Sequence, residues 1–396
     1  MSAPPRLRVA FYTDSPVVGG AENVARSLVA SLGPRVEPIV LGTSTEVVAH
    51  ISSGRAGTEA RVLGKVAGRS DLRTVAAHAA ELRDLGADVV QVDRHLWSGQ
   101  YGVLAAWCAG VPALCVVHGV LPADSLSQRA LTMATARLAR RYVGVSDYVS
   151  RQVCRQLRVP AARVTTVHNG LVHNGLVHDD PVHDDPVHDD GTAAAGSARE
   201  PVSVLCVGRL AFEKGFDVLV RAIAALPGAD AVVVGDGAER SRLEALASEL
   251  GVAGRVRFDG WVEGWAARYQ PAIVVVPSRH EALSLVALEA MRAGLPVVAT
   301  RVGGLPEVVD EPETGVLVEP DDAAALAGAI GALLGDAPRR TRMGAAGRER
   351  VAARFDHGAM VAAYEGLYAS LAGRPAAQAG SNLSRLLRHP HARALL

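Results

Sequence analysis

Two glutamates with seven residues between them, Glu281 and Glu289, are the first candidates for chemistry in this chain. Carboxylate oxygens accept hydrogen bonds from sugar hydroxyls. We expect a helix to begin at an N-cap on Ser284, and the free backbone N–H groups of a helix start bind phosphate. A ligand with its phosphates at this helix start would meet one carboxylate on each side. The alternative is that Glu281 is a solvated loop residue and Glu289 an exposed helix residue.

Two cations, Arg209 and Lys214, lie in another predicted loop between a buried strand and a helix. An arginine fork binds phosphate oxygens in pairs, and a lysine acts on them as a point charge. Nearly all the basic residues are arginine, and the only other lysine is Lys65. We therefore predict that Arg209 and Lys214 flank a diphosphate.

Glycines follow several predicted strands, where the lack of a Cβ lets backbone N–H groups approach a phosphate closely. They are Gly19, Gly20, Gly208, Gly235 and Gly237. For the first pair the alternative is a tight turn that uses glycine for steric reasons alone. Gly235-Asp236-Gly237 resembles part of a dinucleotide fingerprint, but the third glycine is missing, so we reject that motif.

Two further strand ends offer candidate contacts. His118 follows the predicted strand Val111–Val117 and would project into the crevice where doubly wound sheets bind ligands. A lone histidine is more often structural, but this location favours a functional role. Trp261 and Val262 follow the predicted strand Val256–Phe258, and their apolar loop could receive a nucleobase.

Alternating strands and helices must position these residues, which predicts an α/β protein with two doubly wound parallel sheets. We expect strands at residues 7–12, 38–41, 88–92, 111–117, 142–145, 164–167, 202–207, 231–234, 256–258, 273–276, 297–300 and 315–318. We expect helices at residues 21–32, 72–85, 99–109, 125–141, 146–157, 216–226, 240–250, 285–292, 321–334, 339–353 and 355–371.

The helix predicted from Ser125 to Arg141 carries Arg129, Arg137, Arg140 and Arg141 on or near one side. Those arginines form either an ordinary solvated face or a patch for a membrane or an acidic acceptor.

Composition narrows the class of protein. The 396 residues exceed what one hydrophobic core usually supports, and the 41 basic residues balance the 41 acidic ones. This balance gives no global field that would favour nucleic acid. The four cysteines form no CxxC pair, so we expect reduced thiols. No run approaches the roughly 18 apolar residues of a membrane span. We expect a cytoplasmic enzyme with at most peripheral attachment to the inner face of the membrane.

A pentapeptide repeat, VHNGL and then VHDDP, covers residues 167–190. Its histidines and aspartates are possible metal ligands, but a low-complexity linker has no core to impose a coordination geometry. We interpret it as a tandem duplication in a tolerant linker and expect no metal site.

Taken together, these motifs resemble glycosyltransferase family 4. The resemblance lies in the motif order: GGAE at Gly19, HNG at His168, GRLAFEKG at Gly208, GDG at Gly235, the spaced glutamates at Glu281 and Glu289, and VGGLPEVV at Val302. It covers nearly the whole chain except the repeat and the tail. It implies a GT-B fold, two Rossmann-like domains with a nucleotide-sugar donor between them, and transfer with retention of anomeric configuration without a metal or other cofactor.

The resemblance also implies roles for individual residues. Arg209 and Lys214 would grip the donor diphosphate, Glu289 the ribose diol and Glu281 the sugar hydroxyls. Backbone N–H groups of Leu283, Ser284 and Leu285 would meet the sugar and phosphate, with Gly19 and Gly20 closing from the other domain. His118 would lie beside the anomeric centre or the acceptor. His118, Arg209, Lys214 and Glu281 are thus the catalytic candidates.

We expect five segments: an acceptor-binding domain at 1–166, the repeat-containing linker at 167–200, a nucleotide-sugar-binding domain at 201–354, a final helix at 355–372 crossing back to the first domain, and a polar tail at 373–396. The partners would be a nucleotide sugar, with UDP favoured over GDP on resemblance, and an acceptor hydroxyl on a small molecule, natural product or lipid precursor. The competing functions are a nucleotide-sugar epimerase of similar fold and an inactive scaffold subunit.

Overall fold

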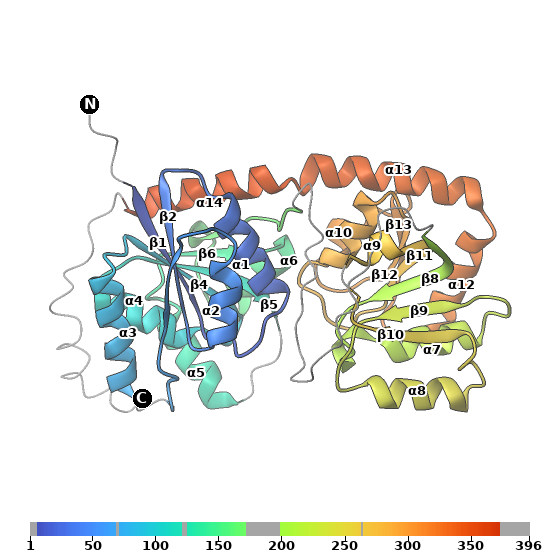
Figure 1. The fold of residues 1–396 in the computed structure, drawn as a ribbon, viewed down its shortest axis with the longest axis horizontal. Helices are drawn as coiled ribbons and strands as arrows, with labels where there is room; N and C mark the ends of the chain where they lie inside the picture. The colour runs from blue at the N-terminus through green and yellow to red at the C-terminus, as the bar shows by residue number, and fades with distance from the viewer. Residues whose placement is uncertain (1–5, 69–70, 121–124, 172–198, 263, 373–396) are drawn as a thin grey trace. The chain divides into compact units, whose positions relative to one another are not determined.

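The computed structural model describes residues 6–68, 71–120, 125–171, 199–262 and 264–372, which form two compact units. The N-terminal unit comprises the described residues up to Gly170 and those from His357 onward, and the C-terminal unit comprises Leu171 and residues 199–356 (Figure 1). Most of the pentapeptide repeat, with His173, His178, His183 and His188, lies outside the described residues, as does the tail from 373.

The N-terminal unit contains a seven-stranded parallel sheet in the order β3-β2-β1-β4-β5-β6-β7. Its strands are β1 (Leu7–Thr13), β2 (Val36–Gly42), β3 (Glu59–Val62), β4 (Val89–His95), β5 (Ala113–Gly119), β6 (Arg141–Gly144) and β7 (Val164–Thr166). Its helices are α1 (Gly20–Ser31), α2 (Thr45–Ser52), α3 (Leu72–Asp84), α4 (Gln100–Ala109), α5 (Leu126–Thr135), α6 (Asp147–Gln156) and α14 (His357–Ala372). The direction of winding reverses between β1 and β4, which is where a doubly wound sheet binds its ligand.

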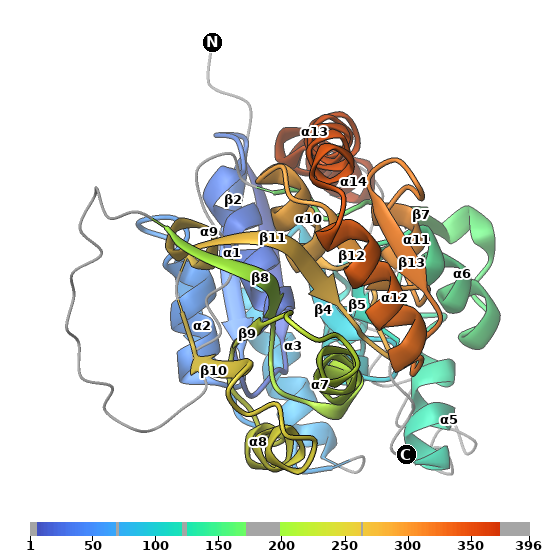
Figure 2. The ribbon, with the colours of Figure 1, turned by 90° about the vertical axis from the view of Figure 1, so that its right-hand side faces the viewer.

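The C-terminal unit repeats this plan with a six-stranded parallel sheet in the order β10-β9-β8-β11-β12-β13. Its strands are β8 (Glu200–Val207), β9 (Ala231–Val234), β10 (Val256–Gly260), β11 (Tyr269–Val276), β12 (Val297–Thr300) and β13 (Gly315–Val318). Its helices are α7 (Phe216–Ala224), α8 (Arg240–Glu249), α9 (Trp265–Arg268), α10 (Leu285–Arg292), α11 (Leu305–Val308), α12 (Ala323–Leu334) and α13 (Ala337–Arg354). Figure 2 looks onto this unit, with α7 and α8 below the strands and α10 and α13 above them.

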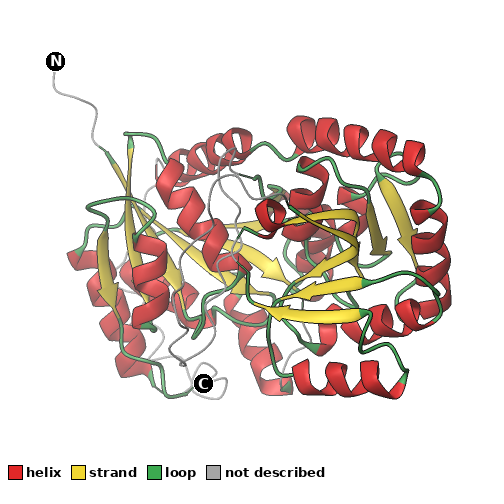
Figure 3. Cartoon of the chain, turned by 45° about the vertical axis from the view of Figure 1, so that its right-hand side comes forward, coloured by secondary structure: helices red, strands yellow, loops and turns green. Residues whose placement is uncertain are grey.

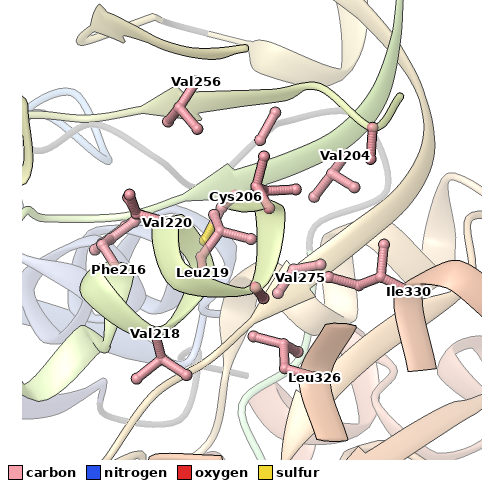
Figure 4. Close-up of a cluster of buried hydrophobic side chains, with 14 of the residues drawn as sticks. Val204, Cys206, Phe216, Val218, Leu219, Val220, Val256, Val275, Leu326 and Ile330 are labelled. Atoms are coloured by element: carbon pink, nitrogen blue, oxygen red, sulfur yellow. The ribbon is translucent and has the colours of Figure 1, made fainter. Parts of the chain in front are cut away.

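Helices flank the sheet in each unit, so the central strands are buried on both faces (Figure 3). Figure 4 shows the result in the C-terminal unit, where Val204 and Cys206 of β8 pack with Leu219 of α7 and Ile330 of α12. Valine-rich runs without polar alternation were the signal for these strands, and the doubly wound α/β class predicted from them is confirmed.

The last helix, α14, belongs to the N-terminal unit. Its Glu365 Oε1 accepts a hydrogen bond from the Gly33 backbone at 2.6 Å, and Tyr368 Oη donates to Gln91 of β4 at 2.5 Å. Two polar contacts, of which that of Tyr368 is buried, thus join the end of the described chain to β4 and to the loop before β2.

One predicted helix is wrong in extent. The structure ends α5 at Thr135, and Arg141 already begins β6, which pairs with β5. The strand predicted at residues 142–145 is thus present as β6, with Tyr142 and Val143 fully buried, and a turn at residues 136–138 separates it from α5. Of the four arginines, only Arg129 lies on the helix, so they do not share one helical face.

Two chemical expectations can be compared with the structure. All four cysteines are free thiols, and Cys108, Cys115 and Cys206 are buried while Cys154 is half-buried. Among the described residues, no helix combines the length and the apolar character needed to cross a bilayer.

Candidate active site

The strand order brings the two main candidate loops of the C-terminal unit side by side. β8 and β11 are neighbours in the sheet and pair in parallel, so both end at the same edge. The loop after β8 carries Arg209 and leads into a short 3-10 helix, Phe212–Lys214, and the loop after β11 carries Glu281. This edge is the point at which the winding of the sheet reverses, the usual ligand position in such folds.

Lys214 and Glu281 form an ion pair across these loops. Lys214 Nζ donates to Glu281 Oε2 at 2.9 Å, and Ser278 Oγ donates to the same oxygen at 3.2 Å. Burial by itself would lower the pKa of Lys214, but the charge and hydrogen bond of Glu281 outweigh it and raise the pKa above its ordinary value. Lys214 is therefore a charged ammonium at neutral pH, and 30% of its side chain is exposed.

Arg209 lies in the same loop but points its charge outward. Its Nη2 donates to Glu213 Oε1 at 2.6 Å, and 53% of its side chain is exposed. Such an exposed pair contributes little to stability, so an anionic ligand can recruit Arg209 at small cost.

The two glycines after β9 are required by a close approach to the backbone that follows β8. Gly235 has a φ of +126°, and a Cβ there would overlap the carbonyl oxygen of Gly208. A Cβ on Gly237 would in turn meet the carbonyl of Leu210. The GDG motif thus has a packing reason of its own, independent of any ligand.

The helix start between the two glutamates forms as the sequence predicts. Ser284 is the N-cap of α10, and its hydroxyl accepts a hydrogen bond from Ala287 N at 3.3 Å. Leu283 and Leu285 are buried on either side of it. The carbonyl of Glu281 accepts from Gly304 N at 3.1 Å, which ties this loop to the VGGLPEVV segment.

Glu289 is not an exposed helix residue, so that alternative is wrong. Only 1% of it is exposed, and Oε2 accepts a hydrogen bond from the indole nitrogen of Trp265 at 3.0 Å. Trp265 lies on α9, 24 residues earlier in the chain. A buried carboxylate needs such a partner, and nothing in the local sequence pattern indicated which side chain supplied it.

The two apolar residues of the loop after β10 differ in their exposure to solvent. Trp261 is 43% exposed, whereas Val262 is buried. A large exposed indole at this sheet edge is available for stacking on a flat ring.

In the N-terminal unit, the glycine pair stands at the start of α1. Gly19 is the N-cap, and Glu22 Oε2 accepts a hydrogen bond from the Gly19 backbone at 3.0 Å. Glu22 is buried, and burial raises its pKa. Part of the GGAE motif therefore serves to cap the helix.

His118 on β5 lies in a chain of buried hydrogen bonds. Its Nε2 lies 2.9 Å from Asp93 Oδ1, and both side chains are nearly buried, at 6% and 5% exposed. Gln91 Nε2 donates to both oxygens of Asp93, at 3.0 and 3.1 Å, and Tyr368 donates to Gln91. Because a carboxylate only accepts, Nε2 carries the hydrogen of this bond.

The sequence prediction missed Asp93 and Gln91. Both alternate with valines along β4, and two polar residues inside an otherwise apolar strand were a usable signal. Their partners, His118 and Tyr368, are 25 and 277 residues distant, which no local pattern can indicate.

Family models and relatives now identify the class of protein. Residues 18–174 match the model described as Glycosyltransferase Family 4, and residues 192–350 match the one described as Glycosyl transferases group 1. D-inositol 3-phosphate glycosyltransferase 1 of Catenulispora acidiphila is 33% identical in an alignment of 355 residues that covers 81% of this chain and 80% of that protein. The chain belongs to glycosyltransferase family 4.

Other relatives of this glycosyltransferase match a smaller part. Lipopolysaccharide core biosynthesis glycosyltransferase LpsE of Rhizobium meliloti is 39% identical over 168 residues, which cover 42% of this chain and 49% of that protein. The chain thus spans about half the length of LpsE, and 57% of an uncharacterized glycosyltransferase of Methanocaldococcus jannaschii.

Solved structures establish the fold. Anabaena HepE in complex with UDP-glucose superimposes with a TM-score of 0.76 at 20% identity, covering 92% of this glycosyltransferase and all of HepE. The galactosyltransferase WaaB, in its apo form, gives a TM-score of 0.67 at 18% identity, covering 92% of this chain and 99% of WaaB. The two parallel Rossmann-like sheets are thus those of the GT-B fold, as the sequence predicted.

Proposed function

We propose that this protein is a retaining glycosyltransferase that moves a hexosyl group from a UDP-sugar to an acceptor hydroxyl. The observation that carries the proposal is the pairing of Lys214 with Glu281 at the edge shared by β8 and β11. A charged ammonium beside a carboxylate offers one group to a phosphate and one to sugar hydroxyls, which together make up the reacting end of a nucleotide sugar. The crystal structure of HepE with UDP-glucose supports the choice of UDP.

We assign binding of the donor diphosphate to Arg209 and Lys214. As the bond to the sugar breaks, negative charge develops on the leaving phosphate, and two fixed cations stabilise that charge. Both cations are paired with glutamates in this structure, so a diphosphate must compete with Glu281 for Lys214 and with Glu213 for Arg209. Gly208, Gly235 and Gly237 keep this edge free of side chains at the backbone.

Neighbouring groups are assigned to the sugar, the base and the ribose of the donor. Glu281 accepts from the sugar hydroxyls, the start of α10 at Leu283, Ser284 and Leu285 offers backbone N–H groups, and Trp261 with Val262 receives the base. Glu289 is assigned to the ribose diol. Because Glu289 is buried against Trp265, this role requires one carboxylate oxygen to become accessible when the donor binds.

In the N-terminal unit we assign Gly19 and Gly20 to the donor and His118 to the reacting carbon or the acceptor. No side chain stands out as a covalent nucleophile. We therefore propose attack from the face of the leaving group: a leaving-phosphate oxygen takes the acceptor proton, the acceptor oxygen bonds to the anomeric carbon, and the carbon–oxygen bond to the phosphate breaks.

The test is to incubate the purified protein with UDP- and GDP-sugars in EDTA, with and without a panel of alcohol acceptors. We expect release of UDP and a product with the anomeric configuration of the donor, as read by NMR. Conversion of the donor sugar to an epimer without UDP release would support the epimerase instead. Neither turnover nor thermal stabilisation by any of these donors would refute the proposal.

A further inference from the structure

Arg279 lies two residues before Glu281 and is bound on every side. Its Nη1 and Nη2 donate to the two oxygens of Asp217, both at 2.9 Å, and Nη1 also donates to the Phe212 carbonyl at 2.7 Å. Its Nε donates to Asp321 Oδ1 at 2.7 Å. Only 11% of the Arg279 side chain is exposed, so its charge is largely buried among these partners.

The partners of Arg279 come from elements far apart in the sequence. Asp217 lies in the first turn of α7, 62 residues before it, and Asp321 lies 42 residues after it, just ahead of α12. Asp321 has a φ of +62°, a conformation that aspartate tolerates better than most residues. The guanidinium also stacks over the ring of Phe212 at 4.2 Å, and that ring is itself 57% exposed.

The backbone strengthens the same junction. Arg279 N and His280 N both donate to the carbonyl of Glu213, at 2.8 and 3.3 Å. Side chain and backbone together therefore attach the loop after β11 to Phe212 and Glu213, which belong to the 3-10 helix that ends at Lys214.

The ion pair between Arg279 and Asp217 holds the two loops together at neutral pH. Burial would raise the pKa of Asp217, but its hydrogen bonds to Arg279 and the arginine's charge outweigh burial and lower it. A planar fork matches two carboxylate oxygens at once, and a lysine at this position would lose both the second bond and the stacking on Phe212.

We propose that Arg279 is a positioning residue for the donor site: by binding Asp217 and Phe212 it fixes the loop of Glu281 against the 3-10 helix of Lys214. The Lys214–Glu281 distance is then set by Arg279 and not by the pair itself. The consequence for catalysis rests on the function proposed above, whereas the geometric claim does not.

The geometric claim has a test that needs no donor, because the chain contains only two lysines, Lys65 and Lys214. An amine-reactive reagent is applied to the full chain, and the labelling rate of each lysine is followed by mass spectrometry of its peptide. In Arg279→Gln we expect Lys214 to label at least about threefold faster relative to Lys65, because its carboxylate partner is no longer held in place. An unchanged ratio overturns the proposal.

Two further variants guard against a general loss of structure. Asp217→Asn removes the acceptor charge from the other side and should raise the ratio in the same direction. Arg255→Gln is the matched control, since Arg255 Nη1 donates to the carbonyls of Ile223, Leu226 and Ala229, away from the site. If Arg255→Gln raises the ratio as much as Arg279→Gln, the effect is loosening of the unit and the proposal is wrong.

The consequence for catalysis is measured separately by titration calorimetry with UDP. Arg279→Lys should weaken UDP binding by roughly tenfold in the wild-type background, because the 3-10 helix that carries Lys214 is no longer held in place and this loss outweighs the weaker competition from Glu281. The loss should be much smaller in a Lys214→Ala background, since both changes act on one interaction. Full additivity overturns the positioning role. A wild-type protein that binds neither UDP nor GDP would refute the proposed function, while the labelling ratio still decides the geometric claim.

Discussion

Lys214 Nζ lies 2.9 Å from Glu281 Oε2, although 67 residues separate the two in the sequence. Glu281 is the largest charged partner of Lys214, and Arg279 holds the loops from which the two side chains project. The Glu281 carboxylate therefore binds the same cation that we assign to the diphosphate.

This pairing predicts opposite effects on nucleotide binding and turnover in Glu281→Gln. Without the carboxylate, UDP no longer competes for Lys214, and its affinity should rise by about two- to tenfold. Turnover of the UDP-sugar should fall by at least about tenfold because a charged acceptor for the sugar hydroxyls is lost. Calorimetry and a UDP-release assay measure the two effects. Glu249→Gln, on the exposed end of α8, is the control, and weaker UDP binding in Glu281→Gln would contradict the competition.

The backbone conformation at Gly303 leads to a second prediction, which concerns stability and donor binding. Gly303 has a φ of +57°, and a Cβ there would overlap the carbonyl oxygen of Glu281. Gly303→Ala must displace the Glu281 loop, so we expect destabilisation of about 1–3 kcal/mol, with a melting temperature several degrees lower and weaker donor binding. Gly254→Ala is the matched control, since no atom lies within 4 Å of its added Cβ. Equal melting temperatures for the two variants would refute this argument.

Asp93 should control the state of His118. In Asp93→Asn an amide can present its NH₂ group to Nε2, which favours the other tautomer and turns a hydrogen toward the site. We expect turnover to fall by at least about tenfold with little change in UDP affinity, because His118 is assigned to the reacting carbon or the acceptor and not to the nucleotide. Asp84→Asn, at the exposed end of α3, serves as the control. Unchanged turnover in Asp93→Asn would remove His118 from the proposed mechanism.

The buried side chain of His78 should make the stability of the protein depend on pH. It is buried, its Nε2 donates to the Gly64 carbonyl at 2.9 Å, and its Nδ1 lies 3.1 Å from Tyr12 Oη. Burial lowers the pKa of His78 below its ordinary value of 6.5. A depressed histidine pKa contributes stability that is full above 6.5 and is lost as pH falls through the lower folded value.

The measurement is the melting temperature of the wild type and of His78→Gln between about pH 7.5 and 5. The wild type should lose stability over this range, and the variant should show a shallower decline. Parallel curves would mean that another group titrates there.

Much of the fold could be predicted because buried parallel strands have a strong local signal. Runs such as Ile273–Val276, followed by Ser284 and later Gly294, specify a strand, a helix start and a helix end with little help from the rest of the chain. The weaker elements α2 and β3 were missed. β3 is an edge strand of four residues with no buried side chain, so it lacks the apolar run that marks the others.

The site could be predicted only as separate loops. Motif order indicated Lys214 and Glu281 individually, but the sheet order that makes β8 and β11 neighbours is a tertiary property. The same holds for Trp265 with Glu289 and for Asp93 with His118. Residues whose function is to hold another residue, such as Arg279, have partners that only the folded chain brings within reach.

The most direct test of the central claim is a comparison of UDP and UMP binding by calorimetry in wild type, Lys214→Ala and Lys65→Ala. If Lys214 holds the diphosphate, the wild type and Lys65→Ala should bind UDP at least about tenfold more tightly than UMP, and Lys214→Ala should lose most of that preference. Retention of the full UDP preference in Lys214→Ala would contradict the account.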